Sequence, residues 1–389
     1  MKKLKFGLLL KVLIAIAAGI VCGLFFPGWT VRIFTTFNGL FSNFLGFIIP
    51  LLILGLVAPG IAELGRGAGR LLLITVALAY GFTLFTGFFT YFNCNAIYPS
   101  LLQNAPSMTV SETVEAASTA PFFGVEMPPL MGVMTALLLA FTLGLGMAVI
   151  KGNSLRTVMD DFRDIINKVI AGVIIPILPI FIFGIFLEMT FAGKVAGVMG
   201  VFLKIIVLIF IMTLVLLLIQ FSIAGIVGKR NPLKLLKNML PAYVTALGTQ
   251  SSAATIPVTL AQTIKNKIPE QIAGFVIPLC ATIHLSGSTL KIVACTLAIM
   301  MTSGMEVGFA QYAGFICMLG IVMVAAPGVP GGAIMASIGI IESMLGFNPE
   351  AVGLMIALYI AMDSFGTACN VTGDGAIAVI IDRINRWKN

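Results

Sequence analysis

Residues 281–292 read ATIHLSGSTLKI, and this polar, glycine-containing stretch interrupts an apolar run that covers residues 269–302. Inside a bilayer, irregular backbone is tolerated only where it is buried in protein or lines a water-filled cavity. The stretch therefore predicts a membrane-crossing helix that unwinds at His284 and resumes a few residues later.

Two pairs of short apolar arms flank this broken helix in the sequence. The first pair, 233–249 and 256–265, is joined by a serine-rich turn and has basic residues at both outer ends. The second pair lies within residues 308–346 and is joined by PGVPGG at 327–332. Because a helix needs ~20 apolar residues to cross a bilayer, each pair predicts a hairpin that enters the membrane and returns.

A hairpin followed by an interrupted helix thus occurs twice, and the flanking charges place the two copies in opposite orientations. Inverted repeats with broken helices are typical of secondary transporters. Glycine and proline that only kink packed helices are the alternative interpretation, but the breaks occur at matching places. We expect the core of a transport domain over 229–389, built from hairpin 229–268, broken helix 269–302, hairpin 308–346 and last helix 350–386.

The composition of the whole chain is that of a membrane protein. Of its 389 residues, 59% are hydrophobic and 10% are charged, against about a quarter charged in soluble proteins. The long polar segment 94–128 is expected to be an outward loop. The predicted fold class is an all-α polytopic membrane protein with eight transmembrane helices and two re-entrant helical hairpins. The six N-terminal helices are expected at 7–26, 33–58, 70–93, 129–150, 165–192 and 196–228.

The net charge of +8 is explained by membrane topology. Lysines and arginines gather in alternate gaps between the apolar runs and at both ends of the chain, and the positive-inside rule places such gaps in the cytoplasm. We expect a bacterial-type inner (plasma) membrane protein with both termini cytoplasmic and no nucleic-acid partner. The basic start and the apolar run 8–26 are interpreted as an uncleaved first helix. Asp382 is expected to pair with Arg383 or Arg386.

Four polar residues share one face of the last helix. Asp363, Thr367, Asn370 and Asp374 are spaced 4, 3 and 4 apart, which places them on one stripe at 3.6 residues per turn. A carboxylate at membrane depth costs at least ~2.5 kcal/mol, so two of them need cationic or polar partners. A helix that faces a wet crevice without specificity is the alternative.

Two basic side chains near the break are candidate partners for these carboxylates. His284 is the only histidine, and a histidine beside a carboxylate is suited to proton exchange. A neutral histidine that donates to a carbonyl is the plainer interpretation. Lys291 lies two turns beyond, on the same face as His284 if the helix resumes at once. An unpaired lysine is costly in hydrocarbon, so we expect it to contact Asp363, Asp374 or the solute.

Four short motifs in this order resemble the dicarboxylate/amino acid:cation symporter family, the transporters of glutamate and neutral amino acids. They are SSAATIPVT at 251–259, PLCATI at 278–283, GVPGGAIM at 328–335 and NVTGD at 370–374. The resemblance extends in layout to the whole chain. It implies a homotrimer in the lipid bilayer, with trimerising scaffold helices in residues 1–228 and a transport domain that includes the hairpins and moves as an elevator.

The resemblance also implies which residues bind an amino acid substrate. Asp363 matches the family's carboxylate for the substrate ammonium, which favours an amino acid over a plain dicarboxylate. Gly366 stands where many carriers of acidic amino acids have an arginine, so a small neutral amino acid is expected. Lys291 reaching into that space and restoring acidic specificity is the alternative. The other matching positions are Ser251, Ser252, Ser288, Val329, Gly331, Gly332, Thr367 and Asn370.

This sequence departs from the family at its sodium sites. The family's Asn-Met-Asp-Gly-Thr run in the seventh helix is His284-Leu-Ser-Gly-Ser288 here, so Ser286 replaces the acidic residue. The sequence also departs around residues 78–79 and at 323–327, which leaves Asn370 and Asp374 as the retained positions. Hard cations need several oxygen ligands, so these losses make sodium binding doubtful.

The same departures suggest what replaces sodium. We expect His284, protonated and close to Asp374, to stand where the cation would be, with Lys291 a further basic group near the site. Transport is then sodium-independent, and either uncoupled or coupled to protons through His284. A sodium- or proton-coupled symporter of acidic amino acids is the alternative. No cofactor is expected, and the spacing of the six cysteines predicts neither a zinc site nor a disulfide framework.

Two other classes of function fit the sequence less well. An aspartyl intramembrane protease needs two carboxylates face to face, whereas Asp363 and Asp374 are ~16 Å apart by helical rise. A serine protease would need Ser286 to meet a histidine from another element, and the only histidine is two residues away. A channel needs a continuous polar lining, whereas polar residues here cluster at one depth. The protein is therefore not expected to be an enzyme.

Overall fold

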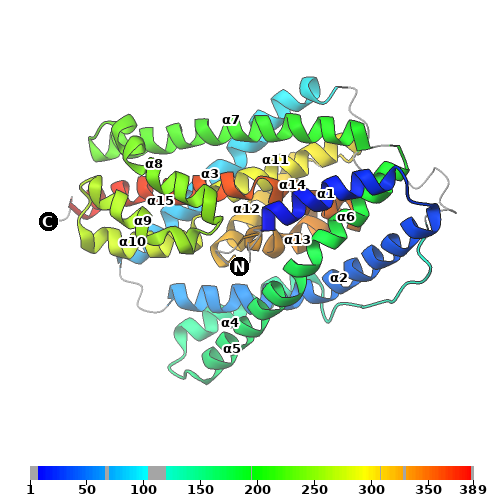
Figure 1. Cartoon of the computed structure of the whole chain (residues 1–389). Coiled ribbons are helices and arrows are strands. Elements are labelled where there is room, and N and C mark those ends of the chain that lie inside the picture. The colour runs from blue at the N-terminus through cyan, green and yellow to red at the C-terminus, as the bar shows by residue number, and fades with distance from the viewer. Residues whose placement is uncertain are drawn as a thin grey trace, which may run out of the picture.

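The computed structural model describes residues 8–65, 70–103, 120–193, 195–306, 308–326 and 330–386, and its regular elements in these ranges are all helices (Figure 1). Several of them are long and apolar enough to cross a membrane. These stretches are Gly28–Ala62, Leu71–Leu101, Ser154–Phe191, Val195–Gly228, Glu270–Thr302 and Asp363–Arg386. The all-helical membrane fold predicted from the composition is confirmed.

The apolar runs of the N-terminal half located the helices there, with ends that differ by several residues. The elements are α1 (Leu8–Gly23), α2 (Gly28–Gly65), α3 (Arg70–Leu101), α4 (Val133–Val149), α5 (Ser154–Val169), a π-helical turn (Ile170–Ile174), α6 (Ile175–Phe191) and α7 (Val195–Gly228). Two of the expected crossings are short, since α1 has 16 described residues and α4 has 17.

The loop expected at 94–128 begins later than predicted, because α3 continues to Leu101; residues 104–119 lie outside the described residues, and 120–128 are not helical. Asn93, the last residue of the expected helix, donates its amide to the carbonyl of Phe89 on its own helix at 2.7 Å. Tyr98 is buried in the extension, and its hydroxyl donates to the carbonyl of Ala294 at 2.9 Å. Burial of this kind allows a helix to continue over polar residues that, without such packing, would favour a loop.

The helix expected at 165–192 begins earlier, because the charged stretch before it forms α5. Met159 and Ile166 bury one face of α5. Beside that face, the half-buried Arg163 pairs with Asp160 at 3.1 Å. The chain then continues through the π-helical turn into α6 as one long helical stretch. The sequence prediction missed α5 because only uninterrupted apolar runs were taken as helices.

The C-terminal half contains two pairs of short helices and two interrupted helices. The elements are α8 (Pro232–Thr249), α9 (Ser252–Lys265), α10 (Glu270–Ile283), α11 (Ser286–Thr302), α12 (Phe309–Ala325), α13 (Gly332–Leu345), α14 (Pro349–Ala361) and α15 (Asp363–Arg386). Within the pairs, α8 packs against α9 and α12 packs against α13. The break predicted at His284 is present, and a second break at Met362 comes directly before Asp363.

Helices α11 and α15 form the buried centre of the molecule, with α7, α8, α9 and α10 packed around α15 (Figure 1). Residues 286–300 of α11 and residues 366–382 of α15 are all buried. Their charged side chains therefore face protein rather than lipid, as the cost of a charge in hydrocarbon requires.

The two central helices cross at a pair of glycines. A Cβ atom on Gly287 would collide with the carbonyl oxygen of Gly366 and with Cβ of Cys369. The start of α11 can therefore approach the backbone of α15 only where a side chain is absent. This close approach brings the polar groups at the break of α10 and α11 against the stripe on α15.

Arg230, between α7 and α8, joins the outer end of the first helical pair to the end of α15. Asp382 accepts from Arg386 at 2.9 Å, which confirms one of its two expected partners. Arg230 also binds Asp382 at 3.1 Å and donates to the carbonyl of Asn266. The first helical pair and the last helix are thus linked at one end of the molecule.

Candidate functional site

The break between α10 and α11 leaves the first backbone N–H groups of α11 without acceptors in their own helix, and Asn370 of α15 accepts from them. Its Oδ1 atom accepts from the N–H of Gly287 at 2.8 Å and lies 3.4 Å from the N–H of Ser288. Its Nδ2 atom donates to Ser288 Oγ at 3.2 Å. The first residues of a helix have no partners within the helix for these donors. Asn370 therefore caps α11 from a different helix and fixes the geometry of the break.

On one side of this cap, Lys291 and Asp363 form a buried ion pair. Lys291 Nζ lies 2.9 Å from Asp363 Oδ1, and the exposed fractions are 0% for Lys291 and 4% for Asp363. The ammonium also lies 3.6 Å from the ring centroid of Tyr359, within the range of a cation–π contact. The sequence predicted that Lys291 would contact Asp363, Asp374 or the solute, and Asp363 is the partner.

The second oxygen of Asp363 is bound by the tip of the α12–α13 pair. Gly331 donates its backbone N–H to Asp363 Oδ2 at 2.8 Å. Gly331 has a φ of +73° and precedes α13, which begins at Gly332. A glycine is suited to this left-handed conformation, and the positive end of the α13 dipole faces the carboxylate. The predicted tip residue Val329 lies outside the described residues.

Gly366 provides the space that the Lys291 side chain fills. A Cβ atom on Gly366 would overlap Cε and Nζ of Lys291. The position at which the family resemblance implies an arginine is therefore occupied by a lysine that arrives from α11. Lys291, Asp363, Tyr359 and Gly331 together are named the Asp363 centre.

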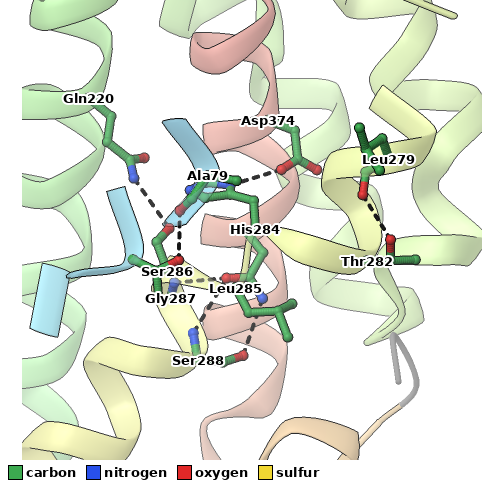
Figure 2. A network of polar contacts seen from close by, with 12 residues as sticks. Ala79, Gln220, Leu279, Thr282, His284, Leu285, Ser286, Gly287, Ser288 and Asp374 are labelled. Carbon is green, nitrogen blue, oxygen red and sulfur yellow. Dashed lines mark hydrogen bonds and ion pairs between the residues drawn. The ribbon is translucent and has the colours of Figure 1, made fainter. Parts of the chain in front are cut away.

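On the other side of the cap, His284 and Asp374 form a second buried pair. His284 Nδ1 lies 2.9 Å from Asp374 Oδ1, and both side chains are fully buried (Figure 2). Gln220 of α7 donates from Nε2 to Ser286 Oγ at 3.2 Å. These four residues are named the Asp374 centre. Ala79 of α3 lies beside the histidine in Figure 2, and the ring of Phe82 on the same helix lies edge-on to the His284 ring with centroids 6.2 Å apart.

Three buried polar atoms of the Asp374 centre have no hydrogen-bond partner among the described residues. They are His284 Nε2, Asp374 Oδ2 and Gln220 Oε1. A Cβ atom built on Gly373 would lie 2.7 Å from both Gln220 Oε1 and His284 Cε1, so these two side chains meet at one place. The centre therefore retains capacity to bind a proton or a polar group.

The two centres are separate, although His284 and Lys291 come from one interrupted segment. They bind carboxylates eleven residues apart on α15, which is ~16 Å by helical rise. The unwound stretch is shorter than predicted, because Ser286 already begins α11. The polar stripe is thus bound at its two ends by two different basic side chains.

The tip of the α8–α9 pair carries the predicted serines. Ser251 caps α9 by accepting from the N–H of Ala254 at 3.3 Å, and Ser252 is buried. Below this tip, Ala246 of α8 packs against Ala368 and Val371 of α15, which flank Asn370. Thr367, predicted on the same stripe, is buried one turn before Asn370.

The sequence prediction missed two members of this network. Tyr359 donates its hydroxyl to Ser288 Oγ at 2.9 Å and lies one turn before Asp363 on the other side of the Met362 break. Gln220 is an isolated polar residue in an apolar run. Its isolation was an available signal, whereas Tyr359 resembles any aromatic core residue.

Comparison with known proteins identifies the family of this chain. Residues 8–384 match the profile of the sodium:dicarboxylate symporter family. The serine/threonine transporter SstT of Acinetobacter baumannii (strain AYE) is 29% identical over an alignment of 413 residues including gaps, which covers 99% of this chain and 98% of the relative. The excitatory amino acid transporter 1 of Ambystoma tigrinum is 27% identical over 307 residues, which cover 76% of this chain and 55% of that protein. Because the profile spans nearly all residues, the chain belongs to the sodium:dicarboxylate symporter family, which consists of transporters and not of enzymes.

Proposed function

We propose that this protein is a secondary transporter of amino acids in a bacterial-type inner membrane. The observation that carries the proposal is the buried Asp363 carboxylate, which faces the tip of one helical pair and already binds an ammonium group. A carboxylate with an ammonium donor at membrane depth is the chemistry needed to bind the amino group of a solute. The named relatives, a serine/threonine transporter and an excitatory amino acid transporter, support this substrate class.

In this proposal the substrate binds between the two helical pairs. Asp363 binds the substrate ammonium. The substrate carboxylate is bound by Thr367, Ser288 and the tip serines Ser251 and Ser252. Asn370 also binds the carboxylate after it releases part of its hydrogen bonding to the start of α11. The α12–α13 tip, held on Asp363 by Gly331, opens to admit the substrate. The transport domain of 229–389 moves as an elevator against scaffold helices of 1–228 in a homotrimer, with both termini cytoplasmic.

The proposed substrates are small neutral amino acids. Gly366 carries no counter-charge for an acidic side chain, and the side chain of Lys291 narrows the space above it. The matching serine/threonine transporters cover almost the full chain, which supports a small side chain. The second candidate is an acidic amino acid, since Lys291 fills the position of the family's arginine and is a cation.

Transport is proposed to be sodium-independent because a histidine occupies the Asp374 centre. His284 Nδ1 binds Asp374 Oδ1, so the carboxylate that resembles a sodium ligand already has a partner. Protonation of His284 gives the pair a net charge of zero without a metal ion. Transport is therefore uncoupled, or coupled to a proton that His284 binds.

A thermal-unfolding screen of the purified protein against the twenty amino acids tests the substrate class. We expect serine, alanine or threonine to raise the melting temperature, equally with and without sodium and at two pH values, because binding stabilises the folded state. D363N should lose the shift while it unfolds as one transition. If the acidic amino acids alone raise the melting temperature, the second candidate replaces the first. If no amino acid does, the proposal is contradicted.

A further inference from the structure

The Lys291–Asp363 pair is an unusual feature for the centre of a solute site. Both charges are buried among the described residues, with exposed fractions of 0% for Lys291 and 4% for Asp363. A buried charge pair is rarely kept for stability, because apolar residues of similar size are often as good. Since the pair occupies the carboxylate that the proposed function assigns to the substrate, its role in that function needs an explanation.

The geometry makes Lys291 and a substrate ammonium mutually exclusive. Asp363 Oδ1 accepts from the lysine ammonium, and Oδ2 accepts from Gly331 N–H. A free amino acid presents the same –NH₃⁺ group that Lys291 presents. The ammonium of a substrate can therefore reach Asp363 only when Lys291 leaves it.

We propose that Lys291 is a tethered ammonium, which holds the substrate's place on Asp363 in the ligand-free carrier and is exchanged for a zwitterionic amino acid. The inference rests on the proposed function and specifies its substrate class. The substrate ammonium takes Asp363, and the displaced lysine ammonium takes the substrate carboxylate. One internal ion pair thus becomes two ion pairs with the solute, and no bond other than these contacts changes.

Counting charges identifies the substrate class. The Asp363 centre has a net charge of zero before binding, since it holds one carboxylate and one ammonium. A zwitterion adds one ammonium and one carboxylate, so the net charge of the Asp363 centre stays zero at each step. An acidic or a basic amino acid would leave one unbalanced charge in a buried place, which is strongly unfavourable. The centre is therefore built for neutral amino acids that carry both charged groups.

The surroundings of Lys291 allow this exchange. Its ammonium lies on the face of Tyr359, whose hydroxyl is fixed by Ser288. Gly366 leaves room for the last atoms of the lysine side chain. A flexible four-carbon stem with a fixed aromatic surface beneath it can move its head group by a short distance and keep a partner for the charge.

The same pair lets the empty carrier return across the membrane. Without a substrate, both oxygens of Asp363 are satisfied and the α12–α13 tip stays closed on it. If Lys291 were neutral, the empty carrier would enclose an unpaired carboxylate, and loss of one partner of a buried pair is strongly destabilising. Lys291 thus neutralises Asp363 in the empty carrier.

The test compares net uptake with exchange of radiolabelled L-serine in proteoliposomes. Exchange needs only the loaded carrier to cross, whereas net uptake also needs the empty carrier to return. We expect K291Q to reduce both rates, because the loaded variant loses the ion pair between the lysine and the substrate carboxylate. Net uptake should fall at least about tenfold more than exchange, because only the empty variant leaves Asp363 without an ammonium partner. K204Q, which removes a lysine outside both centres, should leave both rates unchanged.

Membrane potential gives a second readout. In the wild type the Asp363 centre has no net charge in the empty or the loaded carrier, so it adds no dependence of net uptake on membrane potential between zero and about −100 mV. In K291Q this centre carries one unbalanced negative charge in both states, so net uptake should depend more strongly on voltage than in the wild type. The double variant K291Q/D363N removes both charges, which keeps the fold testable if K291Q alone unfolds, and its serine-induced thermal shift should be absent.

The outcomes separate this inference from the proposed function. Equal loss of exchange and net uptake in a folded K291Q, or unchanged net uptake, contradicts the tethered ammonium while serine transport by the wild type stands. A third result would also contradict the tethered ammonium: the wild type takes up aspartate, and K291Q loses aspartate uptake but keeps serine uptake. Lys291 would then bind an acidic side chain. Absence of transport of any amino acid by the folded wild type contradicts the proposed function itself.

Discussion

Single side chains fix the two ends and the middle of the polar stripe on α15. Lys291 binds Asp363 at one end, and His284 binds Asp374 at the other. Between them Asn370 caps α11. Each contact joins α15 to the interrupted segment of α10 and α11, so the residues that the proposed function needs also hold the broken helix in place.

N370A should destabilise the protein by about 1–3 kcal/mol, because it leaves the buried N–H of Gly287 without its acceptor. The measurement is thermal and denaturant unfolding of the purified protein in detergent. N93A is the matched control, since the Asn93 amide binds only a carbonyl of its own helix, and its effect should be smaller. Equal effects of the two variants would show that the cap between helices does not matter.

H284N should change the dependence of serine exchange on pH, because His284 is the basic partner of Asp374 and a histidine beside a carboxylate is suited to proton exchange. Exchange rates at several pH values, with equal pH on both sides of the membrane, provide the test. Identical pH profiles for wild type and H284N would exclude His284 as the titrating group.

At the scale of elements, the sequence pattern located the broken helix and both helical pairs, because a polar break inside an apolar run has few explanations in a membrane. Uninterrupted apolar runs did not indicate α5, although the amphipathic spacing of its apolar residues is visible in the sequence. They also did not indicate the end of α3 beyond Asn93. The sequence pattern also could not assign partners. His284 and Lys291 were expected on one face, but their contacts with Asp374 and Asp363 depend on how α11 crosses α15.

The crossing of α11 and α15 predicts a strong effect of G287A. Its Cβ would meet backbone of α15 at Gly366, which cannot move without displacing the stripe. We expect a loss of folded protein or a lower melting temperature. G274A is the matched control, because a Cβ on Gly274 of α10 meets nothing within 4 Å. Alanine in a helix interior is favoured over glycine by roughly 0.5–1 kcal/mol, so G274A should be neutral or stabilising.

For the whole molecule, the proposal requires a trimer that holds a scaffold still while the transport domain moves. The protein mass in detergent, from light scattering corrected for bound detergent, should be three times the chain mass of 41.2 kDa. A mass equal to one chain at all detergent and protein concentrations would contradict the scaffold that the proposal assigns to residues 1–228.

The central claim for the molecule is that two internal basic groups take the place of transported cations. Uptake of radiolabelled L-serine into proteoliposomes, with an inward sodium gradient and with choline replacing sodium, tests it most directly. The account predicts rates that agree within about twofold, because the departures at the sodium sites leave too few oxygen ligands for a hard cation. Stimulation by sodium of about tenfold or more would contradict it.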